Sequence, residues 1–175
     1  MKKTVLIFGL VIGAILGTNT VIMMNRMCRN PDFKGNDILG YAAMVVIFSL
    51  IFFGIRSYRN QHLKGFISFR KAFKTGFLIA LVGSTLYVII GLLHYYLFVP
   101  EFLDVYIAYV LKHTPAADLP AKTAEMAHFK EMYGNPLFAV FISYMEVLPV
   151  ATVVALLSAL LLTKKQKDET THQEV

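Results

Sequence analysis

The sequence contains a single cysteine, Cys28, no tryptophan and few charged residues. One cysteine excludes an intramolecular disulfide framework and any zinc site built from several cysteines. Charged residues make up 16% of the 175 residues, whereas soluble domains usually have about 25%. A soluble fold with 57% hydrophobic residues and a mean hydropathy of +0.60 would lack the polar surface to cover its core. The composition therefore indicates a membrane protein, of a length that suits one domain.

Motifs typical of enzymes are also missing. The sequence has no Gly-rich phosphate loop, no nucleophile elbow and no paired-carboxylate arrangement. His94, His113 and His128 are not spaced four residues apart on one helix, and no acid completes a metal motif with them. We therefore expect no enzymatic activity, no cofactor and no metal site. His94 is expected to be an interfacial, hydrogen-bonded residue, and Cys28 a free thiol.

Four apolar runs are long enough to cross a bilayer, whose hydrocarbon core of about 30 Å needs about 20 helical residues. We expect an all-α integral membrane four-helix bundle within residues 1–164, with spans at about 4–24, 38–55, 74–98 and 137–163. The first run resembles a signal peptide, but it is longer than the usual h-region of about 7–15 residues and lacks a clear A-x-A site. It is interpreted as an uncleaved helix. The polar residues 165–175 are expected to form a disordered cytoplasmic tail.

Two segments between the spans are predicted to be helical. Phenylalanines recur every three or four residues over 66–77, which indicates an amphipathic interfacial helix that leads into the third span, with Ser68 as a candidate cap. Residues 100–136 are predicted to form an outer amphipathic helical hairpin. Its second helix is expected to begin at Asp118 and Pro120 and to end at Gly134.

Basic residues predict the orientation. Six of the 17 lie between the second and third spans, with no acid among them: Arg56, Arg59, Lys64, Arg70, Lys71 and Lys74. The side that holds this loop and both termini has 11 Lys and Arg, and the other side has 6. The positive-inside rule places both termini and the loop in the cytoplasm. The loop is expected to contact anionic lipid headgroups, at about 1 kcal/mol per basic residue, or else to bind a regulator. Because these residues flank apolar runs, nucleic acid is not an expected partner.

Glu146 is the only acid in a predicted span. A mid-span acid is disfavoured by about 2.5–3.5 kcal/mol on insertion scales, so it usually faces the bundle interior and has a partner. Pro149 leaves the carbonyl of Met145 without its helical donor and favours a kink. Counting depth along the spans gives a set of candidate partners: Tyr87, Ser84, Thr85 and Ser49. This group is either an ion or proton site or a packing contact made by a protonated glutamic acid.

Small residues in the first span predict close helix packing. Gly9, Gly13 and Gly17 form two overlapping G-x-x-x-G steps. Such spacing lets helix backbones approach closely. The stripe is expected to pack on a neighbouring span of the same chain or, alternatively, to form a homodimer.

Several long segments, in order, carry a family resemblance: MKKTVLIFGLVIG, GYAAMVVIFSLIFFGIRSYRN, GFISFRKAFKTG, PEFLDVYIAYVL, KTAEMAHFKEMYGNP and MEVLPV. Through them, nearly the whole chain before the tail resembles the family of small bacterial membrane proteins catalogued as domain of unknown function forty-one ninety-nine. The resemblance implies four spans. That family is typical of Bacteroidetes, which implies the inner membrane of a diderm bacterium. It implies no activity, cofactor or catalytic residue.

Two functions are compatible with these patterns. The first is a non-enzymatic scaffold, assembly or regulatory component, with an unknown membrane partner. The alternative is a small proton- or ion-linked transporter or channel subunit that uses Glu146 near the Pro149 kink. A water-filled cavity that reaches Glu146 would favour transport. A dry bundle in which Glu146 bonds Tyr87 or a serine would favour the first function.

Overall fold

The structure is a computed structural model that describes residues 1–30 and 37–164, and it has no strand in either range. The predicted tail and most of the turn before the second span lie outside the described residues. Within these two ranges, seven helices follow one another: α1 (Lys2–Arg29), α2 (Asp37–Phe48), α3 (Leu50–His62), α4 (Phe69–Phe98), α5 (Phe102–Lys112), α6 (Leu119–Tyr133) and α7 (Pro136–Leu162). The all-α fold predicted from the sequence is confirmed.

The structure has four helical segments that are long and apolar enough to cross a membrane: Lys2–Arg29, Ile38–His62, Phe69–Phe98 and Pro136–Leu162. The second of them consists of α2 and α3, which meet at Ser49. It extends seven residues beyond the predicted end of the second span, because Arg56–His62 continue the helix as a polar extension. The chain is thus a multi-pass membrane protein.

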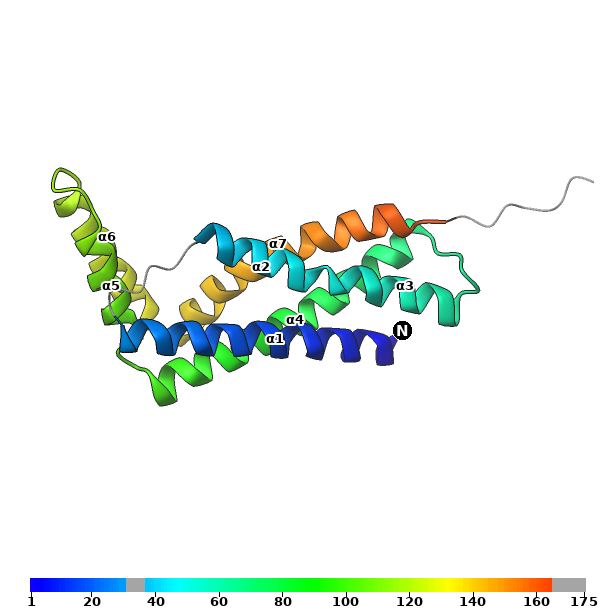
Figure 1. The fold of residues 1–175 in the computed structure, drawn as a ribbon, viewed down its shortest axis with the longest axis horizontal. Helices are drawn as coiled ribbons and strands as arrows, with labels where there is room; N and C mark the ends of the chain where they lie inside the picture. Colours follow the sequence, from blue (N-terminus) through cyan, green and yellow to red (C-terminus); the bar gives the residue numbers. More distant parts are fainter. Residues whose placement is uncertain (31–36, 165–175) are drawn as a thin grey trace, which may run out of the picture.

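The two ends of the bundle differ (Figure 1). The N-terminus, the α3–α4 connection and the last turn of α7 lie together at one end, which we call the basic end. The helices α5 and α6 lie at the opposite end, which we call the hairpin end. This arrangement brings the lysines at the start of the chain and the basic loop to the same end of the molecule.

The helix α4 is the centre of the bundle, since it packs against α1, α3 and α7. Its side chains meet those of the other spans in a close-packed core near the basic end. The largest fully buried side chains of the described residues are Phe48, Ile12, Ile51, Ile55, Ile79, Val147, Thr75 and Ser84. Thr75 satisfies its hydroxyl within α4, by donating to the carbonyl of Lys71 at 2.8 Å.

The predicted amphipathic helix forms the first turns of α4, which continues into the third span as expected. A turn at Lys64 (φ 51°) and Gly65 (φ 87°) reverses the chain, and the positive φ at Gly65 suits a residue without Cβ. The helix α4 then begins at Phe69 and runs unbroken into the span. Ser68 occupies the N-cap position as predicted, but its side chain makes no capping hydrogen bond. The phenylalanine stripe forms a stack along the first turns of α4, with 6.1 Å between the ring centroids of Phe69 and Phe73.

The second helix of the hairpin begins and ends where the sequence predicted. Asp118 is the N-cap of α6, Pro120 lies in its first turn and Gly134 is its C-cap. Asn135 then caps α7, because its side chain accepts a hydrogen bond from the backbone N–H of Leu137 at 3.0 Å. Two tight helix ends in succession thus bring α6 back onto the spans.

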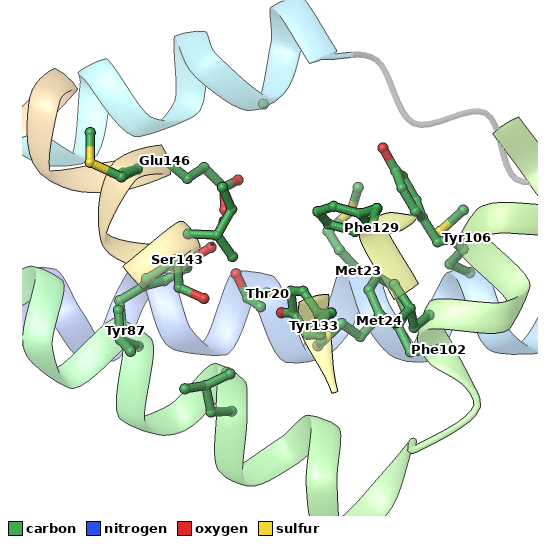
Figure 2. A pocket seen from close by; sticks show the side chains of 18 of the residues that line it. Thr20, Met23, Met24, Tyr87, Phe102, Tyr106, Phe129, Tyr133, Ser143 and Glu146 are labelled. Carbon is green, nitrogen blue, oxygen red and sulfur yellow. Dashed lines mark hydrogen bonds between the residues drawn. The ribbon is translucent and has the colours of Figure 1, made fainter. Parts of the chain in front are cut away.

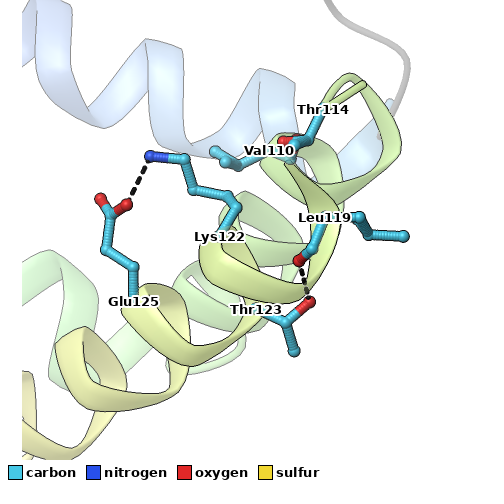
Figure 3. Close-up of polar contacts among 6 residues, drawn as sticks. All are labelled: Val110, Thr114, Leu119, Lys122, Thr123 and Glu125. Atoms are coloured by element: carbon cyan, nitrogen blue, oxygen red, sulfur yellow. Dashed lines mark hydrogen bonds and ion pairs between the residues drawn. The ribbon is translucent and has the colours of Figure 1, made fainter. Parts of the chain in front are cut away.

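Polar contacts form within α6 and between α5 and α6 (Figure 3 shows those within α6). Lys122 pairs with Glu125 at 2.7 Å on the surface of α6, and the hydroxyl of Thr123 donates to the carbonyl of Leu119. Lys130 of α6 pairs with Asp104 of α5 and joins the two helices.

Candidate functional site

Glu146 of α7 and Tyr87 of α4 meet inside the membrane domain. The phenol of Tyr87 donates a hydrogen bond of 3.3 Å to Oε2 of Glu146. Glu146 is the eleventh residue of α7, so it lies about 15 Å along the helix from its start. Tyr87 is buried, with 7% of its surface exposed. The sequence predicted Tyr87 as a partner of Glu146 because the two residues lie at similar depth in their spans, and the structure brings them into contact.

The other predicted partners lie elsewhere. The hydroxyl of Ser49 donates to the carbonyl of Val46 at 2.6 Å, in its own helical segment. Thr85 accepts a hydrogen bond of 2.8 Å from Tyr144. Ser84 is fully buried, and its hydroxyl has no hydrogen-bond partner among the described residues.

A cavity of about 850 Å³ reaches Glu146 from the hairpin end (Figure 2). Its walls come from α1, α2, α4, α5, α6 and α7. They are mostly aromatic and thioether side chains: Tyr41, Tyr87, Phe102, Tyr106, Tyr109, Phe129 and Tyr133, with Met23, Met24, Met27, Met44 and Met145. The side chain of Glu146 is exposed at this cavity. The acid therefore has room for water or a ligand beside it.

Three hydroxyl groups near Glu146 were not singled out from the sequence. Thr20 of α1 lies close enough to Tyr87 for a hydrogen bond, and Ser143 of α7 bears the same relation to Tyr133 of α6. Burial raises the pKa of the Tyr133 phenol, so this group stays neutral and able to donate. A lone threonine in the first span and a tyrosine at the end of α6 do not by themselves indicate a polar site in the sequence. Only the packing of four helices around one acid brings them together.

Pro149 lies on a different surface from Glu146. The helix α7 continues through it, although a proline has no N–H to donate to the carbonyl of Met145. Pro149 lines a shallow, apolar groove on α7, together with Phe141, Leu148 and Thr152. The proline can bear on the acid through the backbone of α7, but it is not a wall of the cavity.

The glycines of α1 face α4. A Cβ atom at Gly13 would lie 2.6 Å from Cβ of Leu86 and 2.7 Å from the carbonyl oxygen of Gly83. Gly9 and Gly17 are equally close to the side chains of Val82 and Ile90, respectively. The stripe is therefore occupied by a helix of the same chain, at distances that only glycine permits.

The basic loop has two kinds of residue. Arg56, Lys64, Arg70, Lys71 and Lys74 are exposed. Arg59 is half-buried, and its guanidinium donates to the carbonyl of Leu162 at 3.2 Å. Arg59 thus stabilises the C-terminal end of α7, where helix carbonyls lack partners.

A backbone bridge adds to this contact. Ile67 and Lys164 exchange two hydrogen bonds of 3.0 Å, and the ammonium of Lys164 lies 5.7 Å from the ring centroid of Phe66. The α3–α4 connection and the end of α7 are therefore fastened together. The sequence did not predict this contact with the end of α7, because only the charge of the loop was interpreted.

His94 and Cys28 remain outside the cavity. The ring of His94 stacks on Phe98 with 5.4 Å between centroids, and its buried Nε2 has no hydrogen-bond partner in the described ranges. The hydrogen bond predicted for His94 is therefore not made through Nε2. Cys28 is a free cysteine. No group of three or more His, Cys, Asp or Glu residues that could hold a metal ion occurs in the part of the chain that the structure describes.

Comparison with known proteins identifies a family but no activity. No curated protein matches the chain, and no solved structure matches it. One family model matches residues 6–164, which is nearly the whole described chain, and its description is "Protein of unknown function (DUF4199)". Nine-tenths of the sequence thus follows this family's pattern, including every helix around the cavity, and the chain belongs to the DUF4199 family.

Proposed function

We propose that the protein is a non-enzymatic component of the inner membrane that binds a small ligand in the hairpin-end cavity, with Glu146 as its polar anchor. One observation carries this proposal: a cavity of about 850 Å³ ends at the single acid of the membrane spans. An acid in a span is disfavoured unless it has a partner or access to water. Here the one hydrogen bond that it accepts from the described residues is long, at 3.3 Å.

Ligand binding is favoured over transport by the other half of the bundle. Near the basic end, Ile12, Ile55 and Ile79 are completely buried in the described structure. A route from Glu146 to the basic end would need these helices to separate. A regulatory role, in which a ligand at the hairpin end changes the packing of the spans, needs only the cavity that is present.

A scaffold or assembly function is the second candidate, and the hairpin favours it. The helices α5 and α6 project at one end of the bundle (Figure 1), and most of α6 is exposed. Such a surface can contact a partner without any ligand. The two functions are compatible if the partner binds differently to the ligand-bound and the ligand-free protein.

The orientation is part of the proposal, with the basic end in the cytoplasm. It rests on the 11 basic residues of that side against 6 on the other. The cavity would then open away from the cytoplasm.

Cysteine labelling tests both the cavity and the orientation. With Cys28→Ser as background, Ser143→Cys places a thiol in the cavity wall, and Ser158→Cys places one in the 4%-exposed core of the same helix. A membrane-impermeant maleimide applied to spheroplasts is expected to label the first variant and not the second. Labelling of Ser143→Cys only after lysis would overturn the orientation. No labelling even in the solubilised protein would overturn the open cavity and the proposed function.

A further inference from the structure

We propose that the ligand of the cavity is an amphipathic organic cation, whose ammonium-type group binds Glu146 and whose apolar body lies against the methionine and aromatic walls. This inference rests on the proposed ligand-binding function and specifies the chemical class of the ligand. The charges, hydrogen-bonding groups and wall chemistry of the cavity each support it.

The charge of the cavity is uncompensated. Glu146 is the only charged side chain among the described residues that line it. The titratable groups that face the cavity from the surrounding helices are phenols: Tyr41 from α2, Tyr87 from α4, Tyr106 and Tyr109 from α5, and Tyr133 from α6. Neutral phenols do not balance a carboxylate. A ligand with one positive charge does, whereas an anionic ligand would be repelled.

The hydrogen-bonding groups point the same way. A short bond from a hydroxyl to a carboxylate measures about 2.5–2.7 Å, so the 3.3 Å contact from Tyr87 leaves most of the acceptor capacity of Glu146 unused. The hydroxyl of Ser143 already donates to the carbonyl of Ala139 at 2.8 Å. The site thus has a free acceptor and few free donors, which suits an N–H donor or a fixed positive charge.

The walls select an organic cation over a metal ion. Calcium and magnesium need about six or more oxygen ligands, and this cavity offers one carboxylate among apolar side chains. Aromatic faces attract organic ammonium groups. Tyr133 lies beside Phe129, with 5.5 Å between ring centroids, and both rings line the cavity (Figure 2). Flexible methionine side chains adapt to apolar bodies of different shape.

Two cavity walls that are also exposed on the outside of the spans explain why the cation should be amphipathic. Tyr41 of α2 is 52% exposed and Met145 of α7 is 50% exposed, although both are cavity walls. Their outer surfaces belong to the sides of spans, which face lipid in a membrane. A ligand whose apolar body also partitions into the bilayer therefore suits these walls.

Binding of tetraphenylphosphonium to the full chain in lipid nanodiscs tests this proposal, with tetraphenylborate as a probe of similar shape and opposite charge. We expect saturable binding of the cation, and a loss of affinity of about tenfold or more in Glu146→Gln. The matched control is Glu125→Gln, the same chemical change on the exposed surface of α6, which is expected to bind like the wild type. Glu146→Asp, which retains the charge, is expected to bind more tightly than Glu146→Gln and keeps the test usable if the glutamine variant does not fold.

The outcomes separate the ligand class from the proposed function. Protection of Ser143→Cys from maleimide by tetraphenylphosphonium, lost in Glu146→Gln, would support the cation site. Equal affinity of the wild type and Glu146→Gln, or equal protection by tetraphenylborate, would overturn it. Labelling of Ser143→Cys without any binding of the cation would also overturn it, while leaving an open cavity for another ligand.

Discussion

The two halves of the bundle are built differently, although α1, α4 and α7 run through both. Near the basic end the spans interlock: a Cβ atom at Gly76 of α4 would lie 2.8 Å from the side chain of Ile55 and 3.2 Å from Cβ of Ala155. Near the hairpin end the spans diverge around about 850 Å³ of space. Small residues close the first half, whereas long, flexible methionines and aromatic rings line the second. Rigidity is thus concentrated at one end, and room for a ligand at the other.

The largest expected effect comes from breaking the close-packed contact of α1 with α4. Gly13→Leu must displace the side chain of Leu86 and the backbone of Gly83, so we expect a loss of about 3 kcal/mol or more and little folded protein. Gly40→Leu is the matched control, because no atom lies within 4 Å of a Cβ atom at that position. Monodispersity and thermal stability in detergent measure the difference. Similar behaviour of the two variants would show that α1 does not depend on this contact.

A core substitution in each half sharpens the comparison. Ile79→Ala creates a void where the described side chains are fully packed, so we expect a loss of about 2–4 kcal/mol. Leu103→Ala removes a side chain that is 7% exposed but borders the existing cavity, and we expect a loss of about 2 kcal/mol, at the low end of the range for such a substitution. Thermal unfolding of both variants in one lipid environment provides the test. A larger loss for Leu103→Ala would mean that the hairpin end is the rigid one.

The smallest expected effect concerns the contact that fastens α7 at the basic end. Arg59→Gln removes the hydrogen bond to the carbonyl of Leu162, so we expect a loss of about 1 kcal/mol. Arg56→Gln changes the same charge at an exposed position and should leave stability nearly unchanged. If both substitutions lower the melting temperature equally, the effect comes from the charge of the loop and not from this hydrogen bond.

The fold followed from the sequence more readily than the site did. Apolar length alone predicts the four spans, and local signals such as Asp118, Pro120 and Gly134 predict the ends of α6. The contact between Glu146 and Tyr87 could be predicted because residues at equal depth on neighbouring spans can meet. The sequence also predicted that the phenylalanine stripe leads into the third span, and α4 runs unbroken from Phe69 to Phe98.

The cavity could not be predicted, since it depends on where helices fail to touch. Methionines and aromatic residues in an apolar run read as ordinary core or lipid-facing positions. Their collection around Glu146 requires the relative placement of six helices. The role of Arg59 was hidden for a related reason, because its partner is a backbone carbonyl 103 residues away that has no signature in the sequence.

The pairing of α1 with α4 also bears on how the chain is made. The first span finds its closest partner not in the next span but in the third, which leaves the ribosome about 40 residues after the first has ended. Until Val82, Leu86 and Ile90 arrive, the glycine stripe of α1 has no matching surface in its own chain. Assembly in the bilayer therefore follows an order: α1 inserts first, and it pairs with α4 only after α4 has been synthesised and inserted. During that interval the close approach that the glycines permit is not yet occupied by α4.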